Sequence, residues 1–331
     1  MPVFQLNELK DLITKVFLAS NVSPENADIV ADALVAAEAD GLASHGTQRV
    51  TYYADQAISG TVNGKVVPEM TQPADAVIRV VAKDGFAYPA IKMGLERAVD
   101  VVAKTGVVAV GIGNSHHCGV VGHHVEALAD KGLVSLAFGN TPAAMAPWGG
   151  SRALYGTNPI AFASPRPGQA PIVVDFAMSK VARGKIMLAA KQGKPIEEGW
   201  ALDKDGNPIT DAEEAMRGTL MPMGDAKGAA LVMVVEILSA ALTGSHFGFE
   251  ANSFFDTEGD SPRVGQFFVI FKPELFSPDY LDRMGVLVQA IVEQPGTRMP
   301  GERRQGLRDK AHKEGVTIPD ALYDDLKKRA G

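Results

Sequence analysis

The sequence predicts an α/β protein with a mixed central sheet that is not of the Rossmann type, flanked by helical segments at both ends. Short apolar runs typical of buried strands alternate with helical segments through the middle of the chain. Near both ends, apolar residues recur at helical spacing instead. A Rossmann fold is disfavoured because Gly111-x-Gly113 carries His116 where the Gly-x-Gly-x-x-Gly fingerprint needs its third glycine.

Three helices are expected in the first sixty residues. The first is indicated by apolar residues at helical spacing between positions 6 and 17. A second begins after Ser23-Pro24, since serine caps a helix and proline suits its first position. A third is predicted from Gly46 to Ser59, and the turn-rich residues 61–75 are expected to be a connection.

The middle of the chain is expected to hold the sheet. Strands are predicted at 77–81, 107–112, 134–138, 160–163, 172–176 and 265–271. Helices are predicted between them at 88–104, 120–131, 179–190 and 228–242. The helix over 228–242 carries small and aliphatic residues nearly all round, so we expect it to be fully buried. Three more helices are expected at about 278–294, 301–314 and 318–329.

Composition excludes several classes of protein. The 331 residues are 46% hydrophobic and carry a net charge of −7 without long runs of one sign, so nucleic-acid or membrane-surface binding is not expected. No apolar run reaches the ~18 residues of a membrane-spanning helix, and no signal peptide is visible. The single cysteine, Cys118, excludes an intrachain disulfide and favours a reducing compartment, so we expect a cytoplasmic protein.

Two adjacent histidines, His116 and His117, follow the strand predicted at 107–112. Polar side chains at strand ends often carry the chemistry of α/β proteins, and histidine exchanges protons near neutral pH. A turn histidine is therefore expected to be a general acid or base. A metal site shared with His123 and His124 is the alternative, but no cysteine or acid lies at ligand spacing. Cys118 as a nucleophile is disfavoured because adjacent residues usually point apart.

A second candidate site lies in Ser44-His-Gly-Thr-Gln-Arg49. On a helix, His45 and Arg49 would share one face, with Tyr52 and Tyr53 near it. An arginine fork binds a carboxylate through two parallel hydrogen bonds, so this face is expected to bind a small anion. The alternative is a surface helix with an ordinary salt bridge.

A third candidate site lies where strands meet turns or helices. Tyr155-Gly-Thr-Asn-Pro159 combines turn chemistry with hydroxyl and amide groups, although it could be a turn only. Asp175 ends a strand and a helix is expected to follow, a junction that presents free backbone N–H groups to an anion. Arg183, with Lys180 and Lys185 close by, could hold the phosphate of a nucleotide. No Walker loop or Gly-x-Ser-x-Gly elbow occurs.

Together these segments resemble the malate/L-lactate dehydrogenase family that is unrelated to the Rossmann-fold lactate and malate dehydrogenases. The likeness spans essentially the whole chain. It is carried by Ser44-His-Gly-x-x-Arg49, Ser115-His-His117, Ala146-Pro-x-Gly-Gly150, Tyr155-Gly-Thr-Asn-Pro-Ile-Ala-Phe162, Asp175-Phe-Ala177, Gly199-Trp-Ala-Leu-Asp203, Lys227-Gly228 and Leu242-Thr-Gly244. The family includes ureidoglycolate and sulfolactate dehydrogenases, diketogulonate reductase, and reductases of Δ1-pyrroline-2-carboxylate and Δ1-piperideine-2-carboxylate.

The resemblance implies a non-Rossmann mixed α/β fold, an intertwined homodimer, and NADH or NADPH in an extended groove. His117 matches the catalytic histidine, acting with His45 and Arg49. Substrate-side positions are matched by Ser44, His45, Arg49, Tyr53 and Thr157. Positions lining the cofactor groove are matched by His117, Asn140, Thr157, Asn158, Asp175, Phe176, Ala177, Lys227, Pro300, Gly301, Glu302 and Arg303, and Arg183 is added as a phosphate ligand. No metal is implied. The loop Gly224-Asp-Ala-Lys-Gly-Ala-Ala230 departs from the family's usual sequence.

The resemblance also implies three parts. Residues 1–75 would be a helical segment carrying substrate-side residues, 76–275 the mixed α/β cofactor-binding core, and 276–331 a helical segment that packs back on the first.

The expected reaction moves a hydride between the nicotinamide and C2 of a small carboxylate, with His117 as acid or base and Arg49 holding the carboxylate. His246–Glu250, Arg263–Gln266 and the turn at 300–304 look like those of the cyclic-imine reductases, so Δ1-pyrroline-2-carboxylate and Δ1-piperideine-2-carboxylate rank first. A 2-hydroxy acid dehydrogenase of the malate, lactate, sulfolactate or ureidoglycolate type is the alternative.

Two further alternatives remain, a histidine-rich metal-binding protein and a nucleotide-binding protein without turnover. NADPH is favoured slightly over NADH because Arg183 and Lys180 could meet a 2′-phosphate.

Overall fold

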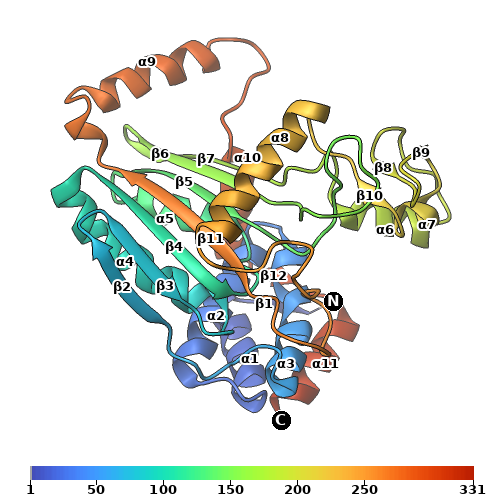
Figure 1. Ribbon diagram of the computed structural model, residues 1–331. Helices are drawn as coiled ribbons and strands as arrows, with labels where there is room; N and C mark the ends of the chain where they lie inside the picture. The colour runs from blue at the N-terminus through green and yellow to red at the C-terminus, as the bar shows by residue number, and fades with distance from the viewer. Residues whose placement is uncertain (1) are drawn as a thin grey trace.

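The chain folds around a seven-stranded mixed sheet, seen in a computed structural model that describes residues 2–331 (Figure 1). The strand order is β2-β3-β4-β11-β5-β6-β7. The strands are β2 (Glu69–Ala74), β3 (Val77–Val81), β4 (Val107–Ser115), β5 (Val134–Gly139), β6 (Ile160–Arg166), β7 (Gln169–Phe176) and β11 (Val264–Phe271). β3 and β4 run parallel, and the other neighbouring pairs are antiparallel. The predicted mixed, non-Rossmann α/β class is confirmed.

The edge strand β2 lies within the stretch that was expected to be a connection. All six of its residues are exposed, and it contains Pro73. It therefore shows no alternation of buried and exposed side chains, which is the signal that identified the other strands. An exposed strand with proline is typical of a sheet edge.

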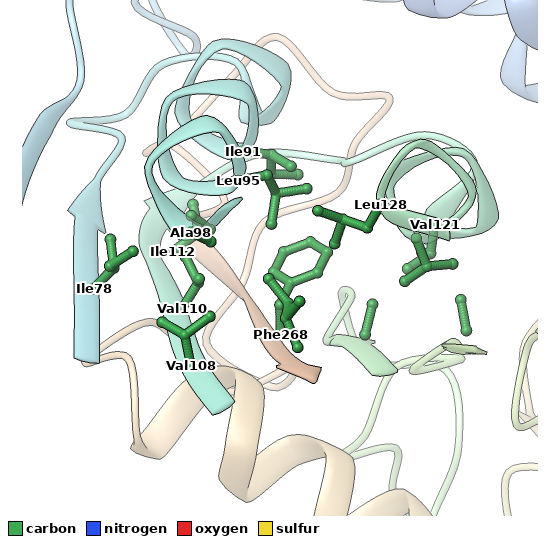
Figure 2. Close-up of a cluster of buried hydrophobic side chains, with 14 of the residues drawn as sticks. Ile78, Ile91, Leu95, Ala98, Val108, Val110, Ile112, Val121, Leu128 and Phe268 are labelled. Atoms are coloured by element: carbon green, nitrogen blue, oxygen red, sulfur yellow. The ribbon is translucent and has the colours of Figure 1, made fainter. Parts of the chain in front are cut away.

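Two helices, α4 (Ala87–Thr105) and α5 (Val121–Ala129), cover one face of the sheet. Alternate residues of β4 point to this face, and Val108, Val110 and Ile112 are fully buried there. Figure 2 shows these side chains with Phe268 of β11, beneath Ile91 and Leu95 of α4 and Leu128 of α5. This packing fixes the end of β4, and with it the residues that follow.

The opposite face of the sheet carries α8 (Asp225–Glu236), which continues into a π-helical turn at Ile237–Ala241 (Figure 1). The expectation that this helix is fully buried is wrong. One side packs on the sheet, but several apolar side chains on its outer side are about half exposed in the single chain: Leu231, Met233, Val234, Ile237 and Leu242.

The two ends of the chain form a helical unit below the sheet in the view of Figure 1. It contains α1 (Leu6–Ala19), α2 (Pro24–Ala39), α3 (Val50–Ser59) and α11 (Asp320–Ala330), together with the antiparallel pair β1 (Val3–Phe4) and β12 (Val316–Thr317). Its core joins Leu9, Ile13 and Phe17 to Ile318 and Leu326.

The remaining C-terminal helices, α9 (Tyr280–Val292) and α10 (Glu302–Glu314), behave differently. α10 packs against α2, whereas α9 contacts β6, has no buried residue and extends away from the sheet (Figure 1). A small lobe contains α6 (Arg183–Lys191), α7 (Ala212–Ala215) and a three-stranded sheet of β8 (Ala201–Leu202), β9 (Pro208–Ile209) and β10 (Thr219–Leu220). Within residues 2–331, no helix is both long and apolar enough to cross a membrane.

Candidate active site

His117 stands just beyond the end of β4, where the sheet meets the N-terminal helices. Its Nδ1 lies 2.6 Å from the Tyr53 hydroxyl of α3. The His45 ring lies 5.4 Å away and the Phe254 ring 5.0 Å away, measured between ring centroids. The second histidine of the pair, His116, shares Tyr53 and Phe254 as neighbours but is fully buried and also contacts Phe86.

His45 and Arg49 lie on a turn, which corrects the helix predicted from Gly46. The backbone forms two 3₁₀ turns, Ala43–His45 and Thr47–Arg49, separated by Gly46, and α3 begins at Val50. Glu38 accepts hydrogen bonds from the backbone N–H and the hydroxyl of Thr47, which holds this geometry. The shared helix face predicted for His45 and Arg49 therefore does not exist.

Arg49 is nevertheless oriented toward the histidines. Its Nε donates to the Ser44 carbonyl over 2.9 Å, and its guanidinium lies 4.5 Å from the centre of the Phe255 ring. The Ser44 hydroxyl is 3.1 Å from His45 Nδ1. Nη1 of Arg49 is buried without a hydrogen-bond partner among residues 2–331. A buried guanidinium with a free N–H group is suited to an anion, because an unpaired buried donor is costly.

The three imidazoles near Arg49 are neutral at neutral pH. Burial, and then the positive charge of Arg49, lowers the pKa of His45 to about 4 and that of His116 to about 3. Burial, Arg49 and the neighbouring histidines lower the pKa of His117 well below its usual range. The site therefore combines one fixed positive charge with a neutral imidazole that can accept a proton.

Tyr52 and Tyr53, both expected near the anion-binding face, diverge. Tyr53 is fully buried, and burial raises its pKa to about 12, so its hydroxyl stays protonated beside His117. Tyr52 is 40% exposed and lies edge-on to Phe255.

A cleft of about 530 Å³ begins beside this turn, and residues 40–42 form one of its walls. The other lining residues are Asp175 at the end of β7 and, from the turn and first half of α10, Arg298, Met299, Pro300, Gly301, Arg303, Arg304 and Leu307. Asp175 accepts a hydrogen bond from the Gly122 N–H over 2.7 Å. A Cβ atom at Gly122 would lie 2.9 Å from both Asp175 Oδ2 and Arg304 Nη1, so this approach requires glycine.

An ion cluster lies beside this cleft, and two of its members, Asp40 and Arg304, line it. Asp40 accepts hydrogen bonds from Arg308 over 2.7 and 2.9 Å, and Glu126 accepts two more from Arg308. His123 Nε2 lies 2.7 Å from Asp40 Oδ2, and Arg304 completes the cluster. Burial alone would raise the pKa of Asp40, but hydrogen bonds from Arg308 and His123 outweigh it and lower this pKa to about 2.

The second histidine pair is thus engaged in packing and ion pairing. His123 binds Asp40, and His124 Nε2 lies 2.9 Å from the Cys118 carbonyl. Among residues 2–331, no group of three or more histidine, cysteine, aspartate or glutamate side chains is arranged to hold a metal ion.

Two residues expected to line the cofactor groove, Asn140 and Asn158, turn their amides inward. Both donate to the buried carboxylate of Glu236, over 3.1 and 2.6 Å, and Gly248 N–H adds a third bond of 2.6 Å. Burial raises the pKa of Glu236 despite these bonds. Sequence reasoning missed Glu236, although a single carboxylate in the apolar run from Leu231 to Ala241 was a usable signal.

Some of the other residues predicted to bind the cofactor lie at or next to the cleft at Asp175, and others lie elsewhere in the chain. Phe176 and Ala177 follow Asp175 at the cleft, and Phe176 is 36% exposed. Glu302 begins α10 and accepts a hydrogen bond from Met299 N–H. Thr157 donates its backbone N–H to the Thr141 hydroxyl over 2.9 Å.

Two of the three cations predicted to hold a phosphate, Arg183 and Lys180, have partners within the chain. Arg183 donates to the carbonyl of Met216 in the small lobe, and Lys180 pairs with Asp225. Helix α6 begins at Arg183, not at Ser179 as expected. Lys227 is exposed in the first turn of α8. The arginines that do gather at the cleft are Arg298, Arg303 and Arg304.

Comparison with known proteins agrees with this architecture. Residues 4–327 match the family described as malate/L-lactate dehydrogenase. The chain is 51% identical over 325 residues to a (2R)-3-sulfolactate dehydrogenase (NADP(+)) of Chromohalobacter salexigens, covering 98% of this chain and 97% of that protein. It is 37% identical to a Δ1-pyrroline-2-carboxylate/Δ1-piperideine-2-carboxylate reductase of Pseudomonas aeruginosa, covering 97% of each.

Two solved structures are closely similar. A Δ1-piperideine-2-carboxylate reductase from Pseudomonas syringae superposes with a TM-score of 0.94 at 34% identity, covering 99% of this chain and all of that one. A sulfolactate dehydrogenase from Methanocaldococcus jannaschii gives a TM-score of 0.91 at 29% identity, covering 99% and 96%.

Proposed function

The chain belongs to the malate/L-lactate dehydrogenase family of oxidoreductases, and on this premise we propose that it is an NADP(H)-dependent 2-hydroxy acid dehydrogenase. The observation that carries the proposal is the meeting of Arg49, with its unpartnered Nη1, and the neutral imidazoles of His45 and His117. Such a site pairs a carboxylate anchor with a proton acceptor.

The substrate class we favour is that of sulfolactate. Identity of 51% to a sulfolactate dehydrogenase, against 37% to a cyclic-imine reductase, reverses the order suggested by the short motifs. The cyclic imines, Δ1-pyrroline-2-carboxylate and Δ1-piperideine-2-carboxylate, remain the second candidate. The Pseudomonas syringae reductase supports them, because its fold superposes with a TM-score of 0.94.

We propose that Arg49 binds the substrate carboxylate and that His117 exchanges a proton with the group on C2. Nδ1 of His117 faces Tyr53, so Nε2 is the nitrogen available to the substrate. His45, beside Ser44, would hold the substrate against His117. A bound nicotinamide supplies or accepts the hydride.

The cleft at Asp175 fits a dinucleotide. Arg298, Arg303 and Arg304 provide the cationic donors that phosphates require, and Gly122 leaves room for a close backbone approach. We therefore assign the 2′-phosphate preference to these arginines in place of Arg183. Phe176, Ala177, Pro300 and Gly301 would form the neighbouring walls, whereas Lys227 of α8 is not among the residues that line this cleft.

A spectrophotometric assay tests the reaction. Purified protein should reduce NADP+ with (2R)-3-sulfolactate, and this activity should exceed that with malate or lactate. His117→Ala should lower kcat by about 10²- to 10⁴-fold, the usual range for a lost general acid or base. Turnover of cyclic imines alone would select the second candidate, and unchanged turnover in His117→Ala would remove His117 from the mechanism.

We also propose that the chain is a homodimer, in which a second copy covers the outer side of α8 and receives α9. The exposed apolar residues of α8 and the absence of buried residues in α9 support this arrangement. Ile237→Glu should yield a monomer in size-exclusion chromatography with light scattering. Ile58→Glu, at an isoleucine of similar exposure on α3, should remain a dimer, and a dimeric Ile237→Glu protein would refute the assignment.

We also propose that the protein resides in a reducing compartment, the cytoplasm. This proposal is supported by the lone Cys118, which is buried and free.

A further inference from the structure

A second cleft lies across the ion cluster from the cleft at Asp175, because His123, Glu126 and Arg308 line it while Asp40 and Arg304 line the first. It encloses about 570 Å³ between α2, α4 and α5, and its lining includes Ile29, Ala36, Tyr88, Ile91 and His124. None of His45, Arg49 and His117 is among its lining residues. Apolar side chains line it together with charged ones that include Asp32, Lys92 and Lys131, so water can enter it without crossing the anion site.

Two tyrosine hydroxyls connect His117 to this second cleft. The Tyr53 hydroxyl lies 2.6 Å from His117 Nδ1 and 3.5 Å from the Tyr88 hydroxyl. Tyr53 is fully buried, while Tyr88 retains 4% of its surface and lines the cleft. The three groups thus form a continuous polar path through an otherwise apolar core that contains Phe17 and Phe86.

We propose that Tyr53 and Tyr88 form a proton relay that exchanges the proton of His117 with water in the second cleft. The inference rests on the role proposed above for His117. Such a relay would let the substrate side stay closed and dry during hydride transfer, because the proton leaves on the other side of the imidazole.

The proton balance in the oxidation direction is complete. The substrate O–H bond breaks as an N–H bond forms at His117 Nε2, and the hydride leaves C2 for the oxidised nicotinamide. The Nδ1 proton of His117 passes to the Tyr53 oxygen, the Tyr53 proton passes to Tyr88, and the Tyr88 proton passes to cleft water. Reduction runs the same transfers backward.

The surroundings favour rapid transfer over storage of charge. A positive imidazolium beside Arg49 in this buried site is costly, and the pKa of His117 is lowered accordingly. Burial raises the pKa of Tyr53 to about 12 and that of Tyr88 well above its usual value. Neither tyrosine can therefore hold a negative charge, so each hydroxyl must accept one proton as it gives up another.

The decisive variant is Tyr88→Phe, which removes one hydroxyl but keeps the ring and the bond between Tyr53 and His117. In single-turnover stopped-flow experiments with a pH-indicator dye, proton release should keep pace with NADPH formation in the unmodified enzyme. In Tyr88→Phe, proton release should lag by about tenfold or more, the scale of a lost proton-transfer group. Tyr52→Phe, which alters an exposed tyrosine next to Tyr53 on α3, should show no lag.

A readout without turnover separates the relay from damage to the fold. The ¹⁵N chemical shifts of the His117 ring should be unchanged in Tyr88→Phe and shifted in Tyr53→Phe. The Tyr53→Phe/Tyr88→Phe double variant should be no slower in proton release than the slower single variant, since both act in one chain. Concurrent proton release and NADPH formation in Tyr88→Phe, with His117→Ala impaired, would overturn the relay alone. Full activity in His117→Ala would overturn the relay and the proposed role of His117 together.

Discussion

Asp40 is the centre of the ion cluster beside the cleft at Asp175, and its replacement by asparagine should weaken the fold in a pH-dependent way. The carboxyl pKa falls from 3.8 to about 2 in the folded protein. At ~1.4 kcal/mol per pKa unit, this lowering corresponds to roughly 2–3 kcal/mol of stabilisation. Asparagine keeps the volume but leaves Arg308 with Glu126 alone, so we expect Asp40→Asn to cost ~2–4 kcal/mol near neutral pH.

Urea unfolding followed by circular dichroism measures this cost. Because the folded-state pKa is lowered, the stabilisation is present above the ordinary pKa and is lost as pH falls toward the folded value. The difference in unfolding free energy between the two proteins should therefore be constant from about pH 7 to about pH 5 and shrink below it. Asp32→Asn, which breaks an exposed pair with Lys10, should cost less than ~1 kcal/mol. A cost for Asp40→Asn as small as this control, or a difference that does not change with pH, would refute the reasoning.

Three other substitutions test the site. Gly122→Ala should raise the KM for NADP+ by about tenfold or more, because the added methyl group would meet Asp175 and Arg304. The control Gly184→Ala, which places a methyl group in open space, should leave this KM unchanged. Equal KM values for NADP+ in the two variants would contradict the prediction. Glu236→Gln should lower the free energy of unfolding in urea by ~2–4 kcal/mol, because the new amide N–H group would face the three N–H donors that now bind the carboxylate. The control Glu250→Gln, at an exposed position, should cost less. Arg49→Lys should raise the substrate KM about tenfold or more and leave the cofactor KM unchanged, because lysine cannot bind a carboxylate through two parallel hydrogen bonds. An unaltered substrate KM would show that Arg49 does not bind the substrate carboxylate.

Elements with a buried face were predictable from the sequence. The strands that form the centre of the sheet alternate or run apolar, and α4, α5 and β11 lie close to their predicted bounds. β2 was missed because no side chain of it is buried, and periodicity carries information only where one face is hidden. Full burial of α8 was predicted wrongly, because apolar residues on its outer side are about half exposed in the single chain.

The sequence predicted which residues form the candidate site better than it predicted how they are arranged. The position of His117 after β4 followed from local sequence, but the break at Gly46 depends on Glu38 binding Thr47 across the turn. Asn158 was expected at the cofactor and instead serves a buried carboxylate that is 78 residues away in sequence. Long-range pairs of this kind, like the salt bridge of Arg308 with Asp40, leave no local pattern.

The joining of the two chain ends has a consequence for biosynthesis. Val3 pairs with Thr317, and Ile318 and Leu326 complete the core formed by α1. Helix α1 is made early, yet part of its apolar surface stays uncovered until residues 316–330 have left the ribosome. A nascent chain would thus complete its seven-stranded sheet before the core around α1 is covered, and a premature stop codon ahead of α11 would release a protein with an exposed, aggregation-prone apolar surface on α1.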